Sequence, residues 1–289
     1  MGGAPSSAAA VPRWWQWPTI LSLDAPAVAV VWQWLFSTVV AVQLRWHHHA
    51  LLAAATWLVY AADRWIEGLL VAPERLISDR HRFYQRWRWS TFAAWLAVAA
   101  AGLVLASTRL TRAEGTAGAI LGLPVLAYLL SQSFGRRHAR LAPKEILIAV
   151  LFALGTACMP FLHRSAPAVA LALPVACFTL LCFANCALIS SWETEVDRSQ
   201  GQTSLALSAP GLLLPLRSSP WLIAFAALVA ALAAPEAQRT ALWCSAASGA
   251  LLGAVDVAHR RIGRQLARVL ADVALLSPLA PLFAAVLLS

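Results

Sequence analysis

Two pairs of carboxylates stand four residues apart, each just after an apolar run of the sequence. Asp63 and Glu67 follow LLAAATWLVYAA, and Glu193 and Asp197 follow NCALISSW. Four residues make about one helical turn, so each pair would share a helix face with Cβ atoms roughly 6 Å apart. Carboxylate oxygens suit Mg²⁺, which commonly takes its remaining ligands from water and substrate phosphate. The two pairs therefore predict a magnesium site that holds a diphosphate.

Basic side chains near the acidic pairs complete this candidate site. Guanidinium and ammonium groups donate hydrogen bonds to phosphate oxygens, which makes candidate phosphate ligands of Arg64, Arg80, Arg82, Lys144 and Arg198. One acidic pair alone would equally fit a solvated helix end. The repeated arrangement favours a shared site, because charge at membrane depth is costly and usually marks function.

The composition predicts an all-α, polytopic membrane protein. The chain has 289 residues, of which 60% are hydrophobic and 12% charged, too apolar for an ordinary soluble domain. Its short connections indicate antiparallel neighbours in one domain over residues 22–289, after an N-terminal interfacial segment at 1–21. Taking about 20 apolar residues per span, we expect a nine-helix transmembrane bundle with helices at 22–43, 49–68, 90–107, 115–134, 144–162, 168–191, 220–234, 240–256 and 267–288.

The distribution of positive charge predicts the orientation of this bundle. Of the 22 Lys and Arg residues, 17 fall in the N-terminal segment and in the loops after even-numbered spans. The positive-inside rule then places the N-terminus and both acidic motifs on the cytoplasmic side, and we expect a bacterial cytoplasmic membrane. The net charge of +9 indicates contact with anionic lipid headgroups rather than with nucleic acid.

Other residues that could bind metals or carry charge receive simpler interpretations. The five cysteines lie in apolar runs without paired C-x-x-C spacing, which supports neither a zinc site nor a disulfide framework. His47, His48 and His49 are consecutive and cannot all face one metal from a helix, so they are interpreted as interfacial histidines. Asp272 follows Arg268 by four residues, which predicts a local ion pair.

The two acidic motifs and their placement resemble those of the UbiA-type superfamily of intramembrane prenyltransferases. VYAADRWIEG is similar to the second half of that family's first motif, N-D-x-x-D-x-x-x-D-G, with Asp63, Glu67 and Gly68 at the matching positions. ETEVDRSQGQTS is similar to the second motif, SDRHRF to the basic loop, and LAPKEILIAVLFALG to the fifth helix. The resemblance extends from about residue 20 to the end of the chain.

This resemblance implies an activity and a set of ligands. The reaction would be transfer of a prenyl group from a prenyl diphosphate to an aromatic or other hydrophobic acceptor of a lipid pathway, with Mg²⁺ as cofactor. Asp63, Glu67, Glu193 and Asp197 would be the catalytic metal ligands. Tyr60, Tyr128 and Asn185 are expected to line the cavity, with an interhelical hydrogen bond as the alternative for Asn185.

The chain also departs from the family pattern, which leaves other functions open. Val59 and Tyr60 stand where the first motif has Asn and Asp, and Gln132 stands where the family often has the Lys of Y-x-x-x-K. A catalytically silent protein of the UbiA fold, binding a lipid or a partner, is therefore the main alternative. A transporter would be expected to show inverted, broken helices, and a CDP-alcohol phosphotransferase one long acidic cluster.

Overall fold

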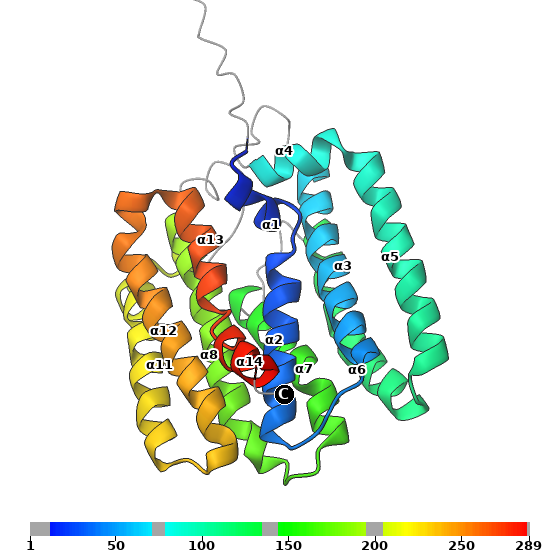
Figure 1. The fold of residues 1–289 in the computed structure, drawn as a ribbon. Helices are drawn as coiled ribbons and strands as arrows, with labels where there is room; N and C mark the ends of the chain where they lie inside the picture. The colour runs from blue at the N-terminus through cyan, green and yellow to red at the C-terminus, as the bar shows by residue number, and fades with distance from the viewer. Residues whose placement is uncertain (1–11, 71–78, 135–143, 195–204, 288–289) are drawn as a thin grey trace, which may run out of the picture.

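The computed structural model describes residues 12–70, 79–134, 144–194 and 205–287 of the chain. Within these ranges the chain is helical and contains no strand. Long helices lie side by side in a bundle, and the short helices α1 (Trp17–Ile20) and α4 (Asp79–Arg86) lie at one end of it (Figure 1). The long helices are α2 (Asp24–Val39), α3 (Trp46–Leu70), α5 (Arg88–Arg109), α6 (Arg112–Phe134), α7 (Lys144–His163), α8 (Val169–Trp192), α11 (Leu213–Ala233) and α12 (Glu236–Ile262).

The chain ends in a bent pair of helices, and short elements connect the long ones. Helices α13 (Arg264–Ala274) and α14 (Leu279–Leu287) meet at a bend of 49°. The prediction of a single helix at 267–288 missed this bend. The remaining short elements are the 3-10 helix η1 (Trp14–Gln16), helix α10 (Leu205–Ser208) and the 3-10 helix η3 (Pro210–Leu212).

The long helices make the chain an integral, multi-pass membrane protein. Six of the described helices are long and apolar enough to cross a membrane, and the number rises to eight if each of two bent helix pairs forms one span. Each of the nine predicted spans overlaps one of the described helices or the α13–α14 pair. Helix α3 is not among the six helices that are long and apolar enough to cross a membrane. The all-helical class is confirmed, whereas the count of nine crossings stays a prediction.

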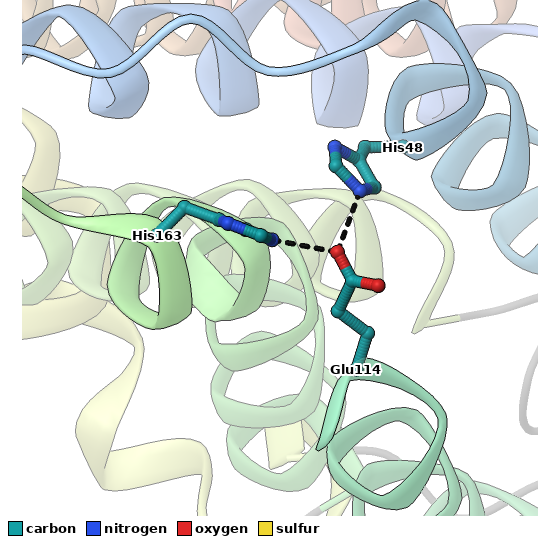
Figure 2. Close-up of side chains that lie close together, drawn as sticks. All are labelled: His48, Glu114 and His163. Atoms are coloured by element: carbon teal, nitrogen blue, oxygen red, sulfur yellow. Dashed lines mark hydrogen bonds and ion pairs between the residues drawn. The ribbon is translucent and has the colours of Figure 1, made fainter. Parts of the chain in front are cut away.

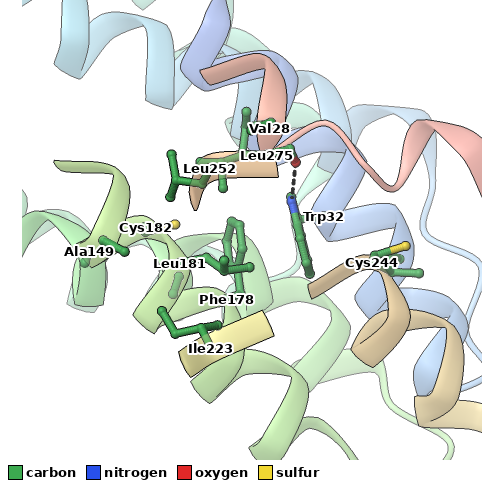
Figure 3. Close-up of a cluster of buried hydrophobic side chains, with 14 of the residues drawn as sticks. Val28, Trp32, Ala149, Phe178, Leu181, Cys182, Ile223, Cys244, Leu252 and Leu275 are labelled. Carbon is green, nitrogen blue, oxygen red and sulfur yellow. Dashed lines mark hydrogen bonds between the residues drawn. The ribbon is translucent and has the colours of Figure 1, made fainter. Parts of the chain in front are cut away.

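Helix α2 is the centre of the packing. It contacts α3, α7, α8, α12 and α13, whereas α5 lies at the edge of the bundle and buries no residue (Figure 1). Trp32 of α2 stacks on Phe178 of α8 with ring centroids 4.4 Å apart, and its indole N–H donates a 2.8 Å hydrogen bond to the carbonyl of Leu275 (Figure 3). Leu275 is the C-cap of α13, just before the bend. Because carbonyl groups at a helix break need partners in an apolar environment, Trp32 stabilises the bend and fixes α13 against α2 and α8.

Helices α11 and α12 approach each other closely at two glycines. A methyl group on Gly249 would lie 2.8 Å from the carbonyl oxygen of Pro220. A methyl group on Gly253 would lie 2.5 Å from the ring of Trp221. Both distances are shorter than a van der Waals contact, so the backbone of α11 at Pro220 and the side chain of Trp221 can pack this closely on α12 only because α12 carries no side chain at these positions.

We expect Gly249→Ala to lower the stability of the folded protein by about 1–3 kcal/mol, because the added methyl group overpacks against backbone that cannot move aside easily. Gly102→Ala in α5 is the matched control, since a methyl group there has no atom within 4 Å. That change should be neutral or stabilise by up to about 1 kcal/mol through helix propensity. Thermal unfolding in detergent measures both variants, and equal transition temperatures for the two would contradict the close packing.

Candidate functional site

A cavity of about 550 Å³ opens among α2, α3, α6, α7, α8 and α13. The charged residues that line it gather at one end of the bundle, where α2, α7 and α13 begin and where α3 and α8 end. Mainly apolar side chains of α3, α6 and α7, together with His48, line the part farther along the helices. The charged end, which we call the mouth, is lined by Asp24, Asp63, Arg64, Lys144, Glu145, Glu193, Arg268 and Asp272.

The structure brings one residue of each acidic motif to this cavity. Asp63 comes from α3, and Glu193 is the C-cap residue of α8. Two of the candidate phosphate ligands, Arg64 and Lys144, line the same cavity. Tyr60, Tyr128 and Asn185, which the sequence placed in the cavity wall, also line it. The side chains of Glu67, Arg80 and Arg82, together with Asp197 and Arg198, lie outside the part of the chain that the structure describes.

Arg268 holds Glu193 of the second motif in place through an ion pair that the sequence did not predict. Its Nη1 atom lies 2.8 and 3.0 Å from the two carboxylate oxygens of Glu193. The prediction that Arg268 pairs with Asp272 on its own helix is wrong, because the guanidinium reaches across to α8 instead. Both side chains of the pair are mostly buried, with 15% and 27% exposed. The pair therefore links α13 to α8 beside the cavity.

Asp272 is hydrogen-bonded to helix α8. Its Oδ1 atom accepts a 3.0 Å hydrogen bond from the Asn185 side chain of α8. For Asn185 the sequence left two roles open, a place in the cavity wall or an interhelical hydrogen bond, and the structure shows both. Asp24, at the start of α2, lines the same mouth. Asp24 and Asp272 are thus cavity residues that the sequence reasoning missed.

A second polar cluster supports the end of α8 from the side away from the cavity. Asp256 of α12 accepts hydrogen bonds from the Trp192 indole at 2.9 Å and from Arg217 Nε of α11 at 3.0 Å. The Trp192 ring stacks on His259 with centroids 5.5 Å apart. Trp192 directly precedes Glu193, so this cluster fixes the position from which Glu193 faces the cavity.

The donor groups at the mouth fit a hard divalent cation together with an anion. Among the described lining residues, carboxyl groups outnumber Arg and Lys side chains five to three. Within the described part of the chain, the buried atoms Glu145 Oε2 and Asn185 Oδ1 accept no hydrogen bond, and the buried Arg268 Nε donates none. Oxygen acceptors suit Mg²⁺ or its water ligands, and the guanidinium suits a phosphate oxygen. Asp63 and Glu193 are the motif residues that line this mouth.

A double-mutant cycle would measure the Arg268–Glu193 pair. Arg268→Gln and Glu193→Gln each break the pair, and each should lower the free energy of unfolding. The double variant should lose less stability than the sum of the two single losses. The difference, the coupling energy, should be about 1–2 kcal/mol after allowance for partial exposure. Thermal unfolding in detergent gives the four stabilities. Additive losses would show that the two side chains do not interact.

The comparisons with known proteins establish the fold of the chain. No protein-family model and no curated protein matches it. Among solved structures, it is similar to the apo structure of a UbiA homolog from Aeropyrum pernix K1, with a TM-score of 0.57 and 16% sequence identity. The match covers 92% of this chain and 98% of that one. The resemblance that the motifs suggested is confirmed at the level of the fold, and the chain has the fold of a UbiA-type membrane protein.

Proposed function

We propose that the protein is a Mg²⁺-dependent intramembrane prenyltransferase, which transfers a prenyl group from a prenyl diphosphate to an aromatic or other hydrophobic acceptor. The observation that carries this proposal is the division of one cavity into a charged mouth and an apolar remainder within a UbiA-type fold. A prenyl diphosphate has the same division, with a highly charged head and a hydrocarbon tail. The cavity volume of about 550 Å³ is within the ordinary range for small-molecule sites, roughly 300–1,000 Å³.

The mouth supplies the groups that a diphosphate leaving group needs. Arg64, Lys144 and Arg268 would donate hydrogen bonds to the phosphate oxygens. Asp63 and Glu193 would hold Mg²⁺, with Glu67 and Asp197 as the proposed remaining ligands of the two motifs. Bound Mg²⁺ would neutralise the charge that develops on the diphosphate as its C–O bond breaks.

The apolar part of the cavity would protect the reacting carbon. An allylic cation, or a transition state resembling one, reacts with any water within reach, and the apolar lining excludes water. Tyr60 of α3 lines the cavity and forms an edge contact with Phe152 of α7, their ring centroids 6.4 Å apart. An aromatic face beside a cation contributes favourable electrostatics in a dry site. We therefore assign Tyr60 to stabilisation of the cationic carbon.

A second function is favoured by two specific observations. Glu193, a proposed metal ligand, is already neutralised by Arg268, and Val59 lines the cavity where the family motif has Asn. These features suit a protein that binds a prenyl diphosphate or another anionic lipid without turning it over. The reaction assay separates the two functions.

Purified protein incubated with labelled prenyl diphosphates, Mg²⁺ and a panel of hydrophobic and aromatic acceptors should form a prenylated product. Asp63→Asn and Asp197→Asn should each lower the rate at least about a hundredfold, because each removes a carboxylate that would bind the metal near the leaving group. Glu236→Gln is the matched control, since Glu236 is an exposed carboxylate at the opposite end of the bundle. It should leave the rate unchanged.

The other possible results of this assay each support or exclude one of the two functions. Mg²⁺-dependent binding of the diphosphate without product, lost in Asp63→Asn, would replace the transferase with the silent binding protein. Failure to bind any prenyl diphosphate would rule out the transferase and would leave, of the second function, only the binding of another anionic lipid. Equal rates for the wild type and Asp63→Asn would reject the proposed metal ligands.

Tyr60→Leu should lower kcat about 30-fold, which corresponds to about 2 kcal/mol of lost cation–π stabilisation. Tyr60→Phe keeps the ring and should retain most of the activity. Binding of a nonreactive diphosphate analogue should change little in either variant, because the mouth is intact. A loss in Tyr60→Phe as large as that in Tyr60→Leu would instead assign the role to the hydroxyl group.

A further inference from the structure

Three side chains from three helices converge at the end of the bundle opposite the mouth. His48 lies in the first turn of α3, Glu114 in the first turn of α6, and His163 is the last residue of α7. Figure 2 shows both imidazole rings directed at one oxygen of the carboxylate. The Nε2 atoms of His48 and His163 lie 2.9 and 2.7 Å from Glu114 Oε1. The three potential ligand atoms lie within 4.8 Å of one another.

The orientation of Glu114 is fixed by the start of its own helix. Its backbone N–H donates to the Thr111 hydroxyl at 3.3 Å, and the Thr111 backbone N–H donates to Glu114 Oε2 at 2.5 Å. This reciprocal pair is a capping box. Because Oε2 is occupied by the cap, Oε1 is the oxygen presented to the two histidines.

The charge of Glu114 lacks a permanently cationic partner in this cluster. The Glu114 side chain is 5% exposed, and within the described part of the chain the ion-pair contacts it makes are to His48 and His163, with no Lys or Arg among them. A buried carboxylate needs charge compensation. A divalent cation between the carboxylate and the two imidazoles would supply it.

We propose that His48, Glu114 and His163 bind Zn²⁺. Two imidazole nitrogens and one carboxylate oxygen are a common ligand set for zinc, and three protein ligands leave a position for water. His163 is 36% exposed, which gives the ion access from the surface. Nitrogen ligands select against Mg²⁺, so this site differs in chemistry from the mouth.

Metal binding requires a rearrangement of protons. His48 Nδ1 accepts a 3.3 Å hydrogen bond from the backbone N–H of Arg45, which places the proton of a neutral His48 ring on Nε2. Binding of Zn²⁺ through Nε2 moves that proton to Nδ1 and frees the N–H of Arg45, an exposed residue, to bind water. A proton on His163 Nε2, which faces Glu114 Oε1, would likewise move to Nδ1 of its own ring, so that Nε2 can bind the metal.

The experiment uses full-length protein purified with a histidine-free affinity tag and stripped of metal with a chelator. Zn²⁺ is titrated by calorimetry in the presence of excess Mg²⁺, and the metal content is measured after gel filtration. We expect about one zinc per chain, and at least about tenfold weaker binding in Glu114→Gln and in His163→Gln. Glutamine still completes a capping box, so Glu114→Gln should preserve the start of α6.

Two control variants separate this site from its surroundings. His49→Gln changes a neighbouring histidine outside the cluster, and Asp63→Asn changes the mouth; both should bind zinc as the wild type does. Co²⁺ titrated into the wild type provides a readout that needs no variant, because ligation by nitrogen and oxygen alters its visible absorption. Absence of stoichiometric zinc, an unchanged Co²⁺ spectrum, or equal affinity in the wild type and Glu114→Gln would overturn the proposal and leave a hydrogen-bonded cluster only.

Discussion

Charged groups inside an apolar bundle must be paired, and this constraint organises the end of the protein that carries the mouth. Lipid gives helices little reason to choose one packing over another, since the lipid tails are as apolar as the helix surfaces. Here Arg268 and Glu193 join α13 to α8, and Arg217 and Asp256 join α11 to α12. Each pair would leave a buried charge unsatisfied if its helices separated. The first ion pair therefore joins two of the helices that surround the mouth, and the second joins two helices that pack against α8.

The bend between α13 and α14 shows the same requirement for backbone groups. A straight ninth span would need no outside partner for its carbonyl groups, but a broken one does. The Trp32 indole satisfies the carbonyl of Leu275, and this places the start of α13, with Arg268 and Asp272, beside α8. An aromatic residue in the apolar core thus determines the position of charged residues at the mouth.

The sequence predicted the convergence of the two acidic motifs because spans 2 and 6 must end on the same side of a bundle of antiparallel helices. The same rule brings the starts of spans 1, 5 and 9 to that side, and Asp24, Glu145 and Arg268 lie there. Of the residues at the starts of these spans, only Lys144 was predicted to belong to the site, since the other residues are not part of a recognisable motif. The partner of Arg268 was mispredicted because spacing along one helix cannot show which face α13 turns toward α8. The histidine triplet was limited in the same way: no spacing rule places Glu114 and His163 beside His48.

The mouth and the cluster of His48, Glu114 and His163 are mechanically connected because they share helices. Helix α3 carries His48 in its first turn and Asp63 near its other end, and α7 carries His163 as its last residue and Lys144 as its first. His48 also lines the cavity, so the cavity extends from the mouth toward the histidine cluster. A change in tilt between α3 and α7 would therefore alter both the mouth and the histidine cluster. A cation held by His48, Glu114 and His163 would restrain that tilt at the histidine end. Four mouth residues come from α3 and α7, two of the helices that His48, Glu114 and His163 join, so a cation bound there would restrain the positions of Asp63, Arg64, Lys144 and Glu145.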